Sequence, residues 1–470
     1  MAAIHNLTIE TRLDPKESGS LIRFFEEWRT EYGRMLRYVW HRYAARASRP
    51  GQAAFNTHLQ QHFGITKRTA NSLIYDAVGR YNALVELKKT EKVHLETKIA
   101  TFKDNIKSFK EDVDAAAKLA AQNKLSGKQL ESYRKKKKSL HDKRLKLNRM
   151  ENSLASLEKS IASGKIKICF GTKKLFHAQN NLEENHYRSH REWYRAFREK
   201  RDANIFYLGS KGETQLNQMF QLFPEGNGQY RIVCRKDGKY APSSKEKLAF
   251  GTCRFSYLSE KLAGQLESGY KGISYRVHFE RKKSCLQEKI YLQAILSVPA
   301  DYQPETTMVE GAIGLDYNDG FIQMSETDRA GNLTGQKKYV LAFHGTGAHA
   351  DTELKQAISE IARHALRKGK SIVCENLDFK NTKSRQMKGR SRKGKAYNRM
   401  THLLDYKRYK ECLKNAAVRM HFDLVMVSPV NTSKIAKQKY CNRRKLNGHA
   451  GAAYVIARRG QGFHDKLQKA

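Results

Sequence analysis

Two carboxylates in the last third of the chain each follow a short apolar run. Asp316 ends the first run, and an Asn-Asp-Gly turn at 318–320 and a second short alternating run come directly after it. A turn of this composition between apolar runs predicts a β-hairpin. Glu375 likewise ends the apolar run 371–374. An acid at the end of a central strand is well placed to hold a divalent metal ion, although the first stretch by itself equally fits an ordinary hairpin with a solvated Asp316.

The segment between these two acids predicts a helix. Leu354, Ile358, Ile361 and Leu366 recur at roughly helical spacing within residues 350–367. The predicted order is strand, turn, strand, helix and then a strand with an acid at its end. This order is expected of an RNase H-like nuclease core. In such a core, carboxylates from neighbouring strands converge to hold metal ions on either side of a scissile phosphate.

The chemistry of phosphodiester hydrolysis explains why carboxylates suit these positions. The charge of the phosphorane must be neutralised and a water must be deprotonated, and a pair of divalent ions does both. Mg²⁺ prefers hard oxygen ligands. We therefore predict that Asp316 and Glu375 are catalytic and bind Mg²⁺ or Mn²⁺, with Asp316 bridging the ions and Glu375 holding one of them.

The charge of the chain indicates a polyanionic partner. Its 470 residues suffice for about two to four domains with cores of their own. Its 89 Lys and Arg residues exceed its 47 Asp and Glu residues, which gives a formal net charge of +42. Nucleic acid is the partner that best explains so large an excess, and a membrane surface is the alternative. No apolar run reaches the roughly 18 residues that a membrane span requires, so we expect no membrane partner.

The cysteines and the N-terminal segment indicate a reducing compartment. Seven cysteines are scattered along the chain without a CxxC pair, which argues against a zinc ribbon, and we expect no zinc. The segment 1–13 lacks the pattern of a signal peptide. We expect a cytoplasmic protein.

The distribution of helical and alternating patterns along the chain predicts a multidomain α+β protein. Residues 1–17 supply a first strand, and residues 18–200 form a helical recognition domain with a long antiparallel helical hairpin at about 88–162. Residues 201–305 alternate as short strands, and we predict a small β-barrel (wedge) domain that the first strand completes. Residues 306–470 form the RNase H-like (RuvC) α/β nuclease domain. The helical lobe is therefore inserted in the β-barrel.

Basic and aromatic residues in two regions are candidates for nucleic-acid contact. The first set lies on the helix that begins near residue 18, where aromatics and arginines are mixed, although each aromatic is at least as well explained as a core residue. The second set lies in a basic, glycine-bearing loop that either tracks phosphates or is a plain flexible connector. The candidates are Arg23, Trp28, Arg29, Arg390, Arg392, Lys393 and Lys395.

Several stretches resemble the TnpB family, the transposon-encoded RNA-guided nucleases related to compact type V CRISPR effectors. Gly314-Leu315-Asp316 resembles the first RuvC motif, and Cys374-Glu375-Asn376-Leu377 resembles the second. The segment 428–435 (SPVNTSKI) is similar to the stretch that enters the third motif, and 449–460 (HAGAAYVIARRG) is similar to the third motif and its helix. The similarity touches most of the chain, but only its last third is dense in motifs.

This chain departs from the family pattern at two places. The third motif usually supplies an Asp where this chain has His449, and the family often carries a four-cysteine zinc ribbon where residues 430–446 hold only Cys441. His449 could bind the metal weakly, act as a general base with a pKa near neutral, or simply begin a helix with a backbone hydrogen bond. Asp405 and Glu360 are weaker candidates for the missing third acid.

The resemblance implies an RNA-guided, metal-dependent DNA endonuclease encoded by or derived from a transposon. Such a protein would be prokaryotic and would associate with the nucleoid when it is bound to its target. Its partners would be a transposon-derived guide RNA and double-stranded target DNA, with the protein recognising only a short adjacent motif. Asp316, Glu375 and His449 would be its catalytic residues. The alternative is a nuclease-impaired RNA-guided DNA-binding protein that acts as a targeting or repressor module. A transposase that acts directly on DNA ends is disfavoured, because no stretch has the pattern of a compact sequence-specific DNA-binding module.

Overall fold

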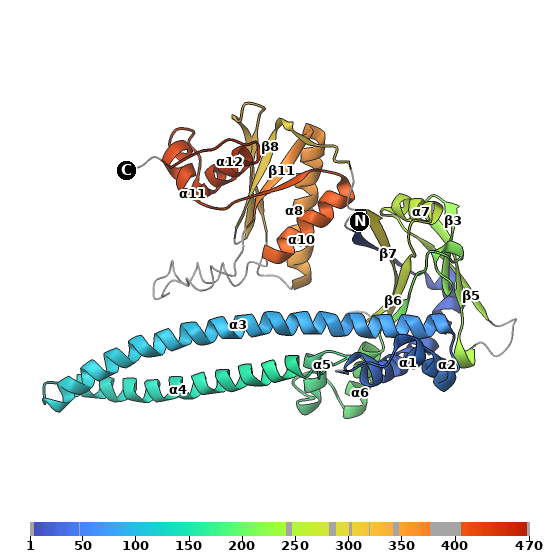
Figure 1. Ribbon diagram of the computed structural model, residues 1–470, viewed down its shortest axis with the longest axis horizontal. Helices are drawn as coiled ribbons and strands as arrows, with labels where there is room; N and C mark the ends of the chain where they lie inside the picture. Colours follow the sequence, from blue (N-terminus) through green and yellow to red (C-terminus); the bar gives the residue numbers. More distant parts are fainter. Residues whose placement is uncertain are drawn as a thin grey trace. The chain divides into compact units, whose positions relative to one another are not determined.

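The protein is a mixed α+β structure, and the computed structural model divides it into two compact units (Figure 1). One unit contains Thr8–Ser297, and the other contains Met1–Leu7 and Val298–Ala470. The structure describes residues 4–46, 48–240, 247–281, 288–299, 303–318, 320–341, 347–376 and 406–467.

The first unit begins with four helical segments. They are α1 (Pro15–Val39), which continues as the π-helical turn η1 (Trp40–Ala44), then α2 (Gln52–Phe63), α3 (Lys67–Ala121) and α4 (Gly127–Ala162). The region predicted as a helical hairpin consists of α3 and α4, which pack against each other over a long distance (Figure 1).

The seam between α3 and α4 is narrow. Along the length that the two helices share, most side chains are exposed, and the buried apolar ones are Ile99, Val113, Leu140 and Leu157. Ion pairs add to this seam, since Lys92 lies 2.8 Å from Glu158 and Lys103 lies 2.7 Å from Glu151. A long hairpin with so thin a core leaves its outer surfaces free for solvent or for a ligand.

The strands of the first unit form two separate sheets. The four-stranded sheet has the order β1-β7-β6-β2 and the three-stranded sheet has the order β3-β4-β5. The strands are β1 (Ile4–Arg12), β2 (Asn204–Tyr207), β3 (Phe220–Gly226), β4 (Gln229–Arg235), β5 (Leu248–Arg254), β6 (Ser274–Glu280) and β7 (Lys289–Pro299). The remaining helices are α5 (Lys173–His177), α6 (His190–Arg201) and α7 (Ser259–Ser268).

The predicted closed barrel is wrong for the described residues, although β1 does join β7 in the larger sheet. A barrel closes only when its outermost strands pair with each other. The edge of β5 is occupied by α1, because Ser18 Oγ donates to Thr252 O (2.8 Å) and accepts from Thr252 N (3.1 Å). Alternation in the sequence predicts the two faces of each strand, but it does not identify the neighbour of an edge strand.

The second unit contains a five-stranded sheet with the order β10-β9-β8-β11-β12. The strands are β8 (Thr307–Asn318), β9 (Phe321–Thr327), β10 (Leu333–Val340), β11 (Lys370–Glu375) and β12 (Leu424–Val427). The strands β8, β9 and β10 form an antiparallel meander, whereas β11 runs parallel to both β8 and β12. The hairpin and the following strand predicted from the sequence are therefore confirmed.

Helices cover both faces of this sheet (Figure 1). One face packs against α8 (Gly347–Lys368) and α10 (Tyr406–Met420), and the other packs against α12 (Gly448–Gly460). The short helices α11 (Thr432–Ile435) and η6 (Ala436–Cys441) pack beside α12. The predicted helix at 350–367 is confirmed as α8. The one predicted from about 398 is described from Tyr406 onward as α10, and its first residues lie outside the described part of the chain.

Strand alternation assigns the residues of β8 to the two faces. Ile313 and Leu315 are buried in the core with α8 and α10, whereas Ala312 packs with Ile456 and Ala457 of α12. Because successive side chains point to opposite faces, Asp316 is directed to the α12 face at the end of the strand.

Candidate active site

Asp316 and Glu375 are lateral neighbours on adjacent parallel strands. In the register of β8 and β11, Leu315 is opposite Cys374, so the next residue of each strand is the acid. Neighbouring strands lie about 4.8 Å apart. Glu375 is the last residue of β11 and Asp316 lies two residues before the end of β8. Both acids therefore lie near the same edge of the sheet, where α/β proteins generally place their ligand sites.

The position of Asp316 is defined by two polar neighbours. Asn318 donates from Nδ2 to Asp316 Oδ2 at 2.8 Å, and His449 Nδ1 lies 3.0 Å from the same oxygen. The carboxylate is mostly shielded, with 14% of the side chain exposed, while 53% of the His449 side chain is exposed. The site therefore opens to solvent on the imidazole side.

Glu375, like Asp316, is partly buried. Burial raises the pKa of Glu375 to about 7, and repulsion from Asp316 adds to the rise, while the hydrogen bond from Thr432 and the charge of Arg459 oppose it. The Thr432 hydroxyl donates to Glu375 Oε1 at 2.7 Å. Two carboxylates that repel each other in a shielded place are stabilised by a bound cation.

The start of α12 places His449 beside Asp316. The Asn447 side chain caps the helix and accepts from the backbone N–H groups of His449 (3.0 Å) and Ala450 (2.8 Å). The imidazole packs edge-on against the ring of Phe321, with the ring centroids 5.1 Å apart. The structure thus brings Asp316, Glu375 and His449 to one end of the sheet, and the His449 side chain does more than begin a helix.

The donor set fits a hard divalent ion with an open coordination sphere. Among the residues that the structure describes, no group of three or more His, Cys, Asp or Glu side chains is arranged to hold a metal ion. Mg²⁺ is commonly bound through one or two carboxylates, with water and substrate phosphate oxygens completing its shell. Asp316 and Glu375 supply two such carboxylates.

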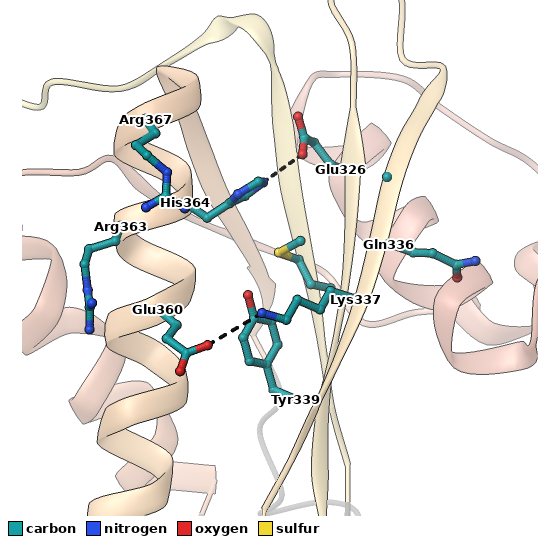
Figure 2. Close-up of a pocket in the computed structure, with 10 residues that line it drawn as sticks. Glu326, Gln336, Lys337, Tyr339, Glu360, Arg363, His364 and Arg367 are labelled. Atoms are coloured by element: carbon teal, nitrogen blue, oxygen red, sulfur yellow. Dashed lines mark hydrogen bonds and ion pairs between the residues drawn. The ribbon is translucent and has the colours of Figure 1, made fainter.

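The two other acids considered for this site do not join it. Glu360 lies on α8, across the sheet from Asp316, and its carboxylate is 3.6 Å from Lys337 Nζ (Figure 2). Asp405 lies outside the described residues. The sequence analysis also missed Asn318, Phe321 and Thr432. Asn318 lies only two residues from Asp316, whereas the contacts of Phe321 with His449 and of Thr432 with Glu375 depend on the pairing of distant segments.

A cavity of about 310 Å³ lies between α8 and the β9–β10 hairpin. Arg363, His364 and Arg367 line it from the helix, and Glu326 and Lys337 line it from the strands. Figure 2 shows that His364 points from the helix toward Glu326. His364 Nε2 lies 2.8 Å from Glu326 Oε2. Because Glu326 and Met324 share the sheet face that packs on α8, this cavity is separate from the Asp316 site.

Stability of the second unit is expected to depend on the charge of Glu326. Burial raises the pKa of Glu326, but hydrogen bonds from Lys370 (2.6 Å) and His364, together with their charges, outweigh burial and lower it. A lowered pKa stabilises the folded state above the ordinary value of 4.5, and the stabilisation is lost as pH falls below it. Chemical denaturation of the wild type and Glu326→Gln should therefore show a stability difference that shrinks as the pH falls from about 5 toward 3. A constant difference would contradict this assignment.

The residues predicted to contact nucleic acid occupy different environments. Trp28 is only 3% exposed and stacks on Phe24, so its ring belongs to the core. Arg29 pairs with Glu288 at 2.7 Å and lies over the Phe279 ring, while Arg23 is exposed. The four loop residues, Arg390, Arg392, Lys393 and Lys395, lie outside the described part of the chain.

Comparisons with known proteins give little similarity. No family model matches the chain, and no curated protein matches it at a significant level. One similar solved structure is a cryo-EM structure of a CRISPR-Cas12f ternary complex, which aligns over 99% of this chain and 100% of that chain. The sequence identity is 11% and the TM-score is 0.22, which does not establish a common fold. Within the described residues, no helix has the length and apolar character needed to cross a membrane.

Proposed function

We propose that this chain is an RNA-guided, divalent-metal-dependent DNA endonuclease related to TnpB and encoded by or derived from a transposon. The observation that carries the proposal is the adjacency of Asp316 and Glu375 near the carboxyl ends of two parallel strands. The repulsion between these acids and the hydrogen bonds that orient them suit the binding of a hard cation. Bound Mg²⁺ or Mn²⁺ would supply charge neutralisation at the phosphate and an activated water.

The residues of this chain act by orienting the two carboxylates. Asn318 and His449 hold Asp316, and Thr432 holds Glu375, so each acid enters the reaction with one oxygen already fixed. Such partners lower the reorganisation that binding and reaction require. In this proposal residues 306–470 are the nuclease domain, residues 18–200 the recognition domain, and residues 201–305 the wedge domain.

The net charge of the chain and its resemblance to RNA-guided nucleases support a guide RNA and a target DNA as its partners. The formal net charge of +42 suits a complex with two nucleic acids, since each phosphate contact releases bound counterions. The motifs around Asp316, Glu375 and His449 resemble those of RNA-guided nucleases. Base pairing would then select the target, while the protein recognises a short motif beside it.

The experiment that tests this function is cleavage of a plasmid library by the protein co-expressed with its native flanking RNA. Cleavage should require the RNA, should occur in Mg²⁺ or Mn²⁺, and should stop when EDTA is added. Sequencing of the cut plasmids would identify the adjacent motif. Tight guide-dependent binding without cleavage in either metal would overturn the nuclease assignment.

His449→Ala is expected to slow cleavage by about 10- to 100-fold, because it removes a polar group that orients Asp316. Single-turnover rates on a fixed DNA target would measure the effect, and target affinity should stay unchanged. A wild-type rate in this variant would make the imidazole a bystander.

The alternative function is a nuclease-impaired RNA-guided DNA-binding protein. The observation that favours it is that His449, rather than a third carboxylate, lies against Asp316. His449→Asp separates the two functions. If the wild type binds its target without cutting and His449→Asp gains cleavage, the natural protein is a targeting module.

A further inference from the structure

A basic groove lies between α1 and α6 in the first unit. Its volume is about 280 Å³, and we call it the α1–α6 groove. On the α6 side, Arg191, Tyr194, Arg195 and Arg198 are spaced by three and four residues, which puts them on one face of the helix. The α1 side contributes Arg29, which the sequence analysis had singled out.

The face of α6 that does not line the groove packs against neighbouring residues and fixes the orientation of the helix. Trp193 is buried, its indole Nε1 donates to Leu175 O at 2.7 Å, and its ring stacks on Phe197 with centroids 5.5 Å apart. Ser189 caps the helix by accepting from Glu192 N. With its apolar face anchored, α6 holds its arginine face toward solvent as a preformed surface.

The acids that line the groove are already paired with other arginines. Asp202 accepts from Arg37 and from Arg201, and Glu199 lies 3.4 Å from Arg281. Arg29 in turn pairs with Glu288.

The three arginines of α6 that line the groove have no such compensation. Across the described residues, Arg191, Arg195 and Arg198 form no ion pair, and all three are exposed. Three uncompensated guanidinium groups on one helix face repel one another, and a chain of phosphates would neutralise them. The ligand chemistry that fits the groove is therefore a polyanion.

Tyr194 indicates that the polyanion is single-stranded. Its ring is 46% exposed, and the guanidinium carbon of Arg198 lies 5.9 Å from the ring centroid. An exposed aromatic ring beside arginines can stack on an unpaired base, which a duplex does not offer.

The carboxylate of Glu199 favours RNA over DNA. Thr30 and Glu199 also line the groove, and the Glu199 carboxylate repels phosphates. It can, however, accept a hydrogen bond from a ribose 2′-hydroxyl, and a carboxylate paired through one oxygen keeps lone pairs for this purpose. Deoxyribose has no such donor.

We propose that the α1–α6 groove binds single-stranded RNA, with Arg191, Arg195 and Arg198 on its phosphates and Tyr194 stacked on an unpaired base. The inference rests on the proposed function only in naming this RNA as a segment of the guide. The groove shares no residue with the Asp316 site, so its binding can be measured without cleavage.

The test measures binding of the full-length Asp316→Asn protein to a single-stranded RNA and to DNA of the same sequence, by fluorescence anisotropy over a range of salt. The groove variant carries Arg191→Gln, Arg195→Gln and Arg198→Gln. Loss of about three phosphate contacts should reduce the salt slope for RNA by about 2. The matched control carries Lys136→Gln, Lys137→Gln and Lys138→Gln on α4, which removes the same charge from exposed positions elsewhere. An equal loss in both variants would overturn the proposal.

Tyr194 and Glu199 test the base and the ribose separately. Tyr194→Ala should weaken RNA binding by about 5- to 100-fold while Tyr194→Phe retains it. Glu199→Gln should reduce the preference for RNA over DNA. If Tyr194→Ala binds like the wild type, or if Glu199→Gln leaves the preference unchanged, the groove does not recognise a base or a ribose as proposed. Absence of plasmid cleavage would overturn the nuclease assignment but would leave these binding results standing.

Discussion

Asp316→Asn is expected to abolish guide-dependent DNA cleavage while leaving RNA and target binding at the wild-type level. The amide keeps the size of the side chain and its contact with Asn318, but it removes the charge that faces Glu375 and the proposed cation. A group that stabilises transition-state charge is worth at least about 10²–10³ in rate, and a metal ligand is expected to exceed this. Single-turnover cleavage and a gel-shift assay on the same target would measure the two properties.

Glu375→Gln should give the same separation of cleavage from binding. Its carboxylate is the neighbour of Asp316 on β11, and its loss leaves one acid in place of two. The matched control is Glu360→Gln, which removes an acid from the other face of the same sheet and should cleave at the wild-type rate. Full activity in either active-site variant, or a loss in the control as large as in Glu375→Gln, would contradict the site.

Gly314→Ala is expected to destabilise the second unit by about 3 kcal/mol, because α12 lies directly on β8 at this position. A Cβ atom at Gly314 would lie 2.0 Å from Ala453 O and 2.6 Å from Ala457 N. Both are backbone atoms of a helix, so the helix must move away from the sheet. For a unit of this size, the melting transition should fall by about 6–12 °C.

The same change should disturb the site, since α12 carries His449 to Asp316. Gly448→Ala is the matched control in that helix, because a Cβ there would meet no atom within 4 Å. Differential scanning calorimetry of both variants measures the effect. Equal transitions for Gly314→Ala and Gly448→Ala would show that the close packing of α12 on β8 does not limit stability.

The local pattern of the chain determined the elements that carry the two acids. The short runs before Asp316 and Glu375 are confirmed as parts of the strands β8 and β11, and the intervening periodic segment is confirmed as α8. These features depend on near neighbours along the chain, through turn composition and the periods of helix and strand. The arrangement of two acids on parallel strands followed from the order of the elements.

The contacts of the site were decided only in three dimensions. His449 meets Asp316 across 133 residues, and Thr432 meets Glu375 across 57. No local sequence pattern predicts either contact, because each depends on the face of the sheet against which a distant helix packs.

The local sequence pattern also does not predict which segment packs against a given surface. The occupation of the β5 edge by Ser18 replaced the expected barrel by two sheets, and the packing of Trp28 made it a core residue. Amphipathic periodicity states which residues are buried but not against what. The sequence by itself therefore determined where the acids stand on their strands, whereas the tertiary structure decided what surrounds them, because burial and hydrogen-bonding partners come from segments far apart in the chain.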